Sequence, residues 1–120
     1  MTNVSWTPGK LTITLTAEPV ERLVALDLCG IDVGRRGELR TVELLLLRPR
    51  LGNFSFGAEE VLDLRNRWGI DLTYNRATDC AVVAVSNVPS DHSDGCDARI
   101  GLTRAGQVGR IEVEGNFRSP

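Results

Sequence analysis

The chain has 120 residues, of which 42% are hydrophobic and 25% are charged, and its formal net charge is −2. This length suffices to bury one hydrophobic core, so we expect a single domain over residues 1–120. The acidic balance gives no long-range attraction to phosphate, and no apolar run, the four leucines at 44–47 included, is long enough to span a bilayer. Neither a nucleic acid nor a membrane is therefore an expected partner.

Hydrophobic patterning predicts three strands in the first part of the chain. Residues 10–16 read KLTITLT, in which leucine and isoleucine alternate with threonine, as in a half-buried strand. The short apolar run at 23–28 predicts a second strand. Residues 38–48 read ELRTVELLLLR and predict a third strand that becomes apolar on both faces and is therefore central in a sheet. Pro49 should end it, because proline cannot donate a hydrogen bond to a central ladder.

The periodicity then changes to that of a helix at about residues 57–68. Val61, Leu64 and Trp68 fall on one face of this segment, and Gly69 suits the position that follows the last helical turn. We therefore predict one helix of about three turns, with Trp68 in the core.

Four further strands are predicted at 70–75, 80–85, 98–103 and 108–114. The last two form a hairpin, with Gly106 at the left-handed position of its loop. Most connections are too short for parallel crossovers. The sequence thus predicts an α+β protein, mainly antiparallel β-sheet of about seven strands, either an open sheet with the helix on one face or a partly closed barrel.

The three cysteines, Cys29, Cys80 and Cys96, are odd in number and contain no C-x-x-C pair. This pattern indicates buried free thiols rather than a disulfide framework. The first residues lack the basic and apolar regions of a signal peptide. We therefore expect a cytoplasmic protein.

The segment 90–97 contains the single histidine, three aspartates and a thiol. It fails the calcium-loop template, because serine and histidine stand where acidic ligands belong. The same residue types are typical of a solvated loop between strands. We therefore expect no metal and no cofactor, and the candidate metal ligands, should a site exist, are Asp91, His92, Asp94 and Asp97.

Three residues are candidates for catalysis. Asp27 interrupts one apolar run and Glu43 precedes another, so either carboxylate would suit general acid–base chemistry if it faced a cavity; the alternative is that both face water. His92 lies near Ser93 and Cys96, but residues this close on one loop rarely reach the geometry of a nucleophile and its base. No reaction is identified, and enzymatic activity stays an open question.

The candidate binding residues lie near the N-terminus and at the ends of predicted elements, and they comprise Trp6, Arg35, Arg36, Arg48 and Arg50. Arginine and tryptophan suit a protein-recognition surface. Because no catalytic motif is present, we expect a non-catalytic binding protein that recognises another protein. The alternative is a small β-barrel enzyme or carrier for an apolar small molecule with an embedded carboxylate. Because one helix cannot cover all of the apolar sheet surface, we also expect a homodimer.

Overall fold

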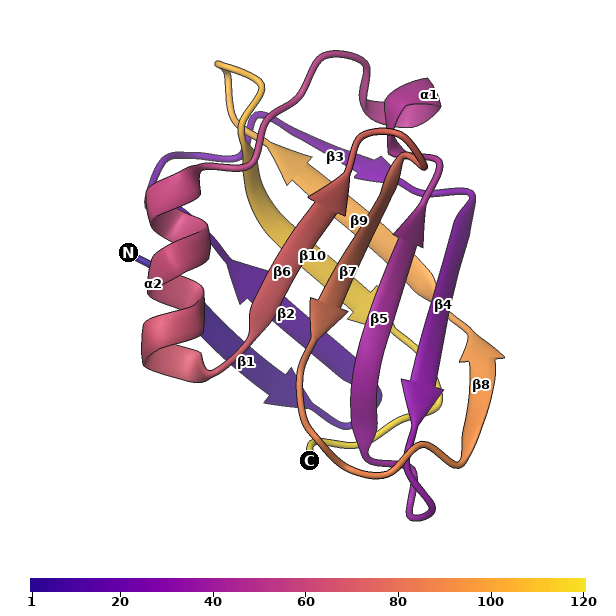
Figure 1. Ribbon diagram of the computed structural model, residues 1–120. Helices are drawn as coiled ribbons and strands as arrows, with labels where there is room; N and C mark the ends of the chain where they lie inside the picture. Colours follow the sequence, from indigo (N-terminus) through magenta and orange to yellow (C-terminus); the bar gives the residue numbers. More distant parts are fainter.

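The computed structural model describes all 120 residues as two open five-stranded antiparallel sheets that pack face to face (Figure 1). The first sheet has the order β1-β2-β10-β9-β3 and the second the order β6-β7-β5-β4-β8. The strands of the first sheet are β1 (Asn3–Thr7), β2 (Lys10–Thr14), β3 (Arg22–Ala25), β9 (Asp97–Leu102) and β10 (Val108–Glu114). Those of the second are β4 (Leu28–Val33), β5 (Leu39–Leu45), β6 (Asp71–Asn75), β7 (Cys80–Ala84) and β8 (His92–Gly95). Two helices, α1 (Leu47–Leu51) and α2 (Ala58–Trp68), lie between β5 and β6 in the chain.

The predicted fold class is confirmed, as are the helix α2 and the β9–β10 hairpin, in which Gly106 has φ 83°. The number of strands is ten rather than about seven. The run predicted as one strand at 23–28 is divided between β3 and β4, which belong to different sheets. β1 and β8 were not predicted: β1 has only two apolar residues, Val4 and Trp6, and β8 has none.

The third predicted strand ends earlier than expected, because Leu47 begins the short helix α1. Pro49 occupies the first turn of this helix, where its missing N–H has no intrahelical partner to lose. The expectation that Pro49 ends the strand is therefore wrong, because the strand already ends at Leu45 and Leu46 turns the chain with a left-handed φ of 54°.

The core lies between the two sheets and contains 23 buried apolar residues. Alternate side chains of the central strands face inward, among them Ile13 of β2, Ile111 of β10, Val42 of β5 and Val83 of β7, all fully buried. The placement of Trp68 in the core is wrong, because its side chain is 41% exposed. The helix α2 lies along one edge of the sandwich (Figure 1), so Leu64 is its only buried residue.

At the opposite edge the chain passes from one sheet to the other twice. β3 pairs with β9 in the first sheet, and their continuations β4 and β8 pair in the second. A disulfide between Cys29 of β4 and Cys96, which precedes β9, joins the two crossings, with the Cα atoms 5.3 Å apart. The expectation of free thiols is therefore wrong for both residues, since parity cannot reveal a pair 67 positions apart; Cys80 is free. Neither helix is long and apolar enough to cross a membrane.

A side-chain latch fastens α2 to the N-terminal segment. Thr2 is buried, and its hydroxyl donates a hydrogen bond of 2.7 Å to the Asp63 carboxylate, while its backbone N–H donates a second of 3.3 Å. Arg67 lies 3.8 Å from the same oxygen. These contacts, the Thr2 hydroxyl first among them, hold the pKa of Asp63 below its ordinary value of 3.8.

The contacts of Asp63 with Thr2 predict that the stability of the fold decreases at acidic pH. Because the folded state lowers the pKa of Asp63, the ionised carboxylate stabilises the fold above pH 3.8, and this contribution is lost as the pH falls through the folded pKa. We expect Asp63→Asn to be less stable than the wild type near pH 6, with the difference shrinking below pH 3.8. Urea unfolding at several pH values measures it. A difference that stays constant down to pH 2 would contradict the role of the charge.

Candidate functional site

The four candidate metal ligands do not converge. Asp91, His92 and Asp94 are exposed at the β8 edge of the second sheet, whereas Asp97 begins β9 of the first sheet. The His92 ring nitrogen Nδ1 lies 3.0 Å from the Asp91 carboxylate. No group of three or more metal-binding side chains gathers anywhere in the chain.

The two candidate carboxylates face solvent. Asp27 lies in the turn between β3 and β4, where its side chain is 69% exposed and 3.9 Å from the Arg50 guanidinium. Glu43 is exposed on the outer face of the second sheet, between the inward-facing Val42 and Leu44. Neither residue is therefore the embedded carboxylate that a catalytic reading of the sequence requires.

Three of the candidate binding residues lie outside any pocket described below: Trp6 packs on the core, and Arg35 and Arg36 are exposed. Trp6 is half-buried and packs edge to face on Phe117, with ring centroids 6.3 Å apart. Arg35 and Arg36 are exposed in the β4–β5 turn. Trp6 thus extends the core, and the two arginines lie on a solvent-exposed turn.

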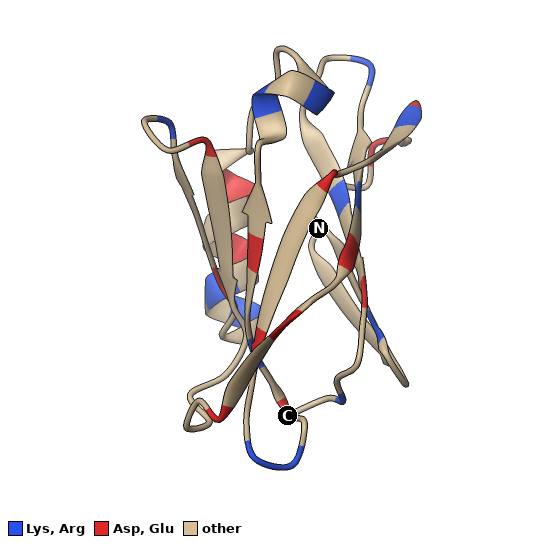
Figure 2. Ribbon diagram, turned by 90° about the vertical axis from the view of Figure 1, so that its right-hand side faces the viewer, with Lys and Arg blue, Asp and Glu red and all other residues tan.

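The arginines of α1 differ from each other in role. Arg50 of α1 donates a hydrogen bond of 3.0 Å to the carbonyl oxygen of Ala25 in the edge strand β3. Arg22 of β3 in turn donates a hydrogen bond to the carbonyl oxygen of Leu51 in α1. Arg50 therefore helps to cover a sheet edge. Figure 2 shows basic positions on α1 and on connecting loops at both ends of the sandwich, and both basic and acidic positions along the strands and on α2. Of the predicted arginines, Arg48 lines a cavity.

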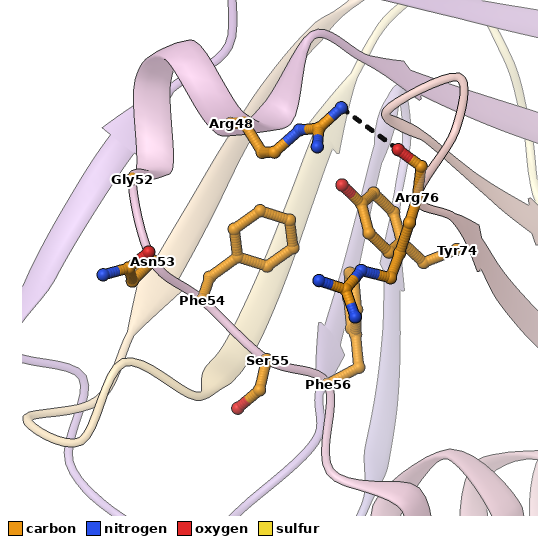
Figure 3. A pocket seen from close by; sticks show the side chains of 8 residues that line it. All are labelled: Arg48, Gly52, Asn53, Phe54, Ser55, Phe56, Tyr74 and Arg76. Carbon is orange, nitrogen blue, oxygen red and sulfur yellow. Dashed lines mark hydrogen bonds between the residues drawn. The ribbon is translucent and has the colours of Figure 1, made fainter.

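This cavity, the arginine–aromatic pocket, has a volume of about 360 Å³ and lies between α1, the segment 52–56 that follows it, and the end of β6. Figure 3 shows it from close by. It is open to solvent. Its lining residues are Arg48, Gly52, Asn53, Phe54, Ser55, Phe56, Tyr74 and Arg76.

Three aromatic rings form the apolar side of the pocket. The centroid of Phe54 lies 5.2 Å from that of Tyr74 and 5.9 Å from that of Phe56, both with edge-to-face orientation. Phe56 and Tyr74 are 5.8 Å apart. These are favourable aromatic distances, and all three residues remain partly exposed. The pocket thus offers apolar surface that is held in place by its own packing.

A buried aspartate organises the polar side of the pocket. Asp79 is 6% exposed and accepts a hydrogen bond of 2.6 Å from the Tyr74 hydroxyl. Its two carboxylate oxygens also accept the backbone N–H of Arg48, at 2.9 and 3.2 Å. Asp79 thereby caps α1, whose own N-cap residue Leu46 provides no side-chain bond. Asp79 ties the turn between β6 and β7 to the start of α1.

The same contact keeps the tyrosine protonated. Burial of the phenol, followed by its hydrogen bond to the Asp79 carboxylate, raises the pKa of Tyr74 above its ordinary value of 10. Tyr74 therefore acts as a hydrogen-bond donor to Asp79.

Two guanidinium groups border the pocket. Arg48 donates a hydrogen bond of 3.1 Å to the carbonyl oxygen of Arg76, and its Nε lies 3.6 Å from Asp79. Figure 3 shows both guanidinium groups beside the aromatic rings. Arg76 forms no ion pair, and no carboxylate lines the pocket. The lining of the pocket is therefore positively charged next to its aromatic rings.

Of the residues that line the pocket, only Arg48 was predicted from the sequence. Phe54, Phe56 and the 75–79 turn were not among the predicted site residues. The usable signal was Asp79 itself, because aspartate tolerates the left-handed φ of 53° that this turn requires. That its carboxylate reaches α1, 31 positions away, was not predictable.

No protein-family model, curated protein or solved structure matches the chain. The expected homodimer stays a prediction. Leu28 and Leu46 are each 50% exposed near the same end of the second sheet and would suit such an interface.

Proposed function

We propose that this protein is a non-catalytic binding domain that recognises another protein through the arginine–aromatic pocket. The observation that carries the proposal is the pair of guanidinium groups, Arg48 and Arg76, beside three mutually packed rings. Arginine and aromatic residues contribute most of the binding energy in protein interfaces. Because Asp79 already fixes Tyr74 and the start of α1, little conformational freedom of these groups remains to be lost on binding.

The alternative, an enzyme or carrier for an apolar small molecule, has less support. Such a protein needs an apolar cavity reached by a carboxylate. The space between the sheets is occupied by the 23 buried core residues, and Asp27 and Glu43 lie at the surface. The partner is therefore proposed to bind at the surface and not in the interior.

The disulfide is evidence about the cellular compartment in which the partner would be bound. From the sequence we expected a cytoplasmic protein. Disulfides, however, persist mainly in oxidising compartments and are rare in the reducing cytosol. The Cys29–Cys96 bond therefore favours an oxidising compartment over the cytoplasm as the place of binding.

Exchange of Arg76 tests the proposal. Arg76 is exposed and forms no ion pair, so Arg76→Ala should change the free energy of unfolding by less than about 0.5 kcal/mol. We expect immobilised wild-type protein to capture a partner from an extract of its own cells at least about tenfold more efficiently than Arg76→Ala does, as for an interface hot spot. Quantitative mass spectrometry of the captured proteins measures this.

The matched control is Arg36→Ala, which removes an exposed arginine from the β4–β5 turn, outside the pocket. It should capture the partner as the wild type does. Capture of the same proteins in equal amounts by all three baits would reject the pocket as the binding site.

A further inference from the structure

The charges of the arginine–aromatic pocket are not balanced from within. Its lining carries two guanidinium groups and no carboxylate. Asp79, which is not part of the lining, accepts hydrogen bonds from the Tyr74 hydroxyl and the Arg48 N–H, and it forms an ion pair of 3.6 Å with the Arg48 Nε. The charge of Arg76 has no carboxylate partner, so an anion that enters the pocket would meet an unpaired guanidinium group and displace no existing salt bridge of Arg76.

The donors favour a carboxylate over a phosphate. A planar guanidinium group can donate two parallel hydrogen bonds to a carboxylate or to a phosphate, so the backbone donors decide between them. Phosphate sites commonly add several backbone N–H groups, as at a helix N-terminus. Here the N–H of Arg48 at the start of α1 is already bound to Asp79. The pocket thus offers side-chain donors, whose geometry fits a carboxylate.

The rings indicate what accompanies that carboxylate. Phe54, Phe56 and Tyr74 leave part of their surface exposed next to the guanidinium groups. A ring from the ligand could join them with the same edge-to-face geometry that they adopt with one another. A volume of about 360 Å³ lies at the lower end of the range for ligand sites, which suits two adjacent side chains better than a large cofactor.

We propose that the arginine–aromatic pocket binds an acidic side chain and an adjacent aromatic side chain in a segment of the partner protein. Arg48 and Arg76 hold the carboxylate, and the ring packs on Phe54 and Phe56. This inference rests on the proposed function, because it names the segment by which the partner is recognised.

The probe is the blocked dipeptide acetyl-Glu-Phe-amide, titrated into the isotope-labelled protein while backbone amide NMR signals are followed. We expect saturable shifts for Tyr74, Arg76 and the 53–56 segment. Acetyl-Gln-Phe-amide, which lacks the charge, and acetyl-Glu-Ala-amide, which lacks the ring, should each bind about tenfold more weakly. Arg76→Ala should reduce binding of the first dipeptide similarly, while Arg36→Ala should not.

Three outcomes would overturn the inference. Equal binding of the glutamine dipeptide would remove the carboxylate from it, and tighter binding of acetyl-phosphoserine-Phe-amide would make the site a phosphate site. Binding of 3-phenylpropionate without binding of the dipeptide would indicate a free small carboxylate in place of a protein segment. If no dipeptide binds but capture of a partner still depends on Arg76, only this inference fails; if capture does not depend on Arg76, the proposed function fails as well.

Discussion

Replacing both Cys29 and Cys96 by alanine should lower the free energy of unfolding by about 4 kcal/mol. The disulfide closes a loop between residues 67 positions apart, and a covalent bond over that distance restricts the unfolded chain strongly. It also joins the two crossings by which the chain passes between the sheets. Urea unfolding gives the free-energy difference, and thermal unfolding should show a midpoint lower by roughly 10–20 °C.

The control for this prediction is Cys80→Ala. Cys80 is a free, half-buried thiol of β7, so its replacement should cost less than about 1 kcal/mol. The wild type after full reduction should unfold like the double variant. A loss below about 1 kcal/mol in the double variant would mean that the pairing of β3 with β9 and of β4 with β8 holds the edge without the covalent bond.

The elements that the sequence predicted well are those whose pattern is local. Leu11, Ile13 and Leu15 alternate with threonines, so β2 was recognisable. In α2, Leu64 and Trp68 have helical spacing and Gly69 follows the last turn, so this helix was recognisable as well. What could not be read was the point at which a strand leaves one sheet for another. The apolar run through Leu26 and Leu28 continues across that corner, although Asp27 marks the turn. Assignment to two sheets depends on pairing partners about 70 positions away.

The site was less predictable than the fold, for the same physical reason. Arg48, Phe54 and Tyr74 come from separate elements. The residues adjacent to each of them in the sequence give no sign that the three lie close together. The hydrogen bonds of Asp79, together with the bond from Arg48 to the carbonyl oxygen of Arg76, bring α1 and the β6–β7 turn together. Candidates judged by their sequence neighbours, such as Asp27 and His92, instead lie in exposed turns or edges. Clustering in sequence was a poor guide to clustering in space.

The second large effect is expected at Asp79. Asp79→Ala should lower the free energy of unfolding by about 3 kcal/mol, because it removes the cap of α1, worth about 1 kcal/mol, and places alanine in a left-handed conformation, which costs about 1–2 kcal/mol. It also leaves the Tyr74 hydroxyl without its acceptor. We further expect weaker binding of acetyl-Glu-Phe-amide, since Arg48 and Tyr74 lose their common anchor.

Asp79→Asn is the matched variant that separates charge from shape. Asparagine tolerates the left-handed conformation and keeps one oxygen acceptor, so the loss should fall to about 1 kcal/mol. Tyr74 is the only tyrosine in the chain, so an ultraviolet pH titration of phenol ionisation reports on this residue alone. In the wild type its pKa should lie above 10; in Asp79→Asn it should fall, because the negative charge is gone, yet stay above the ordinary value, because burial is the larger cause. An unchanged tyrosine titration in Asp79→Asn would show that the carboxylate does not hold the phenol, and the ordered polar side of the pocket would then lack its anchor.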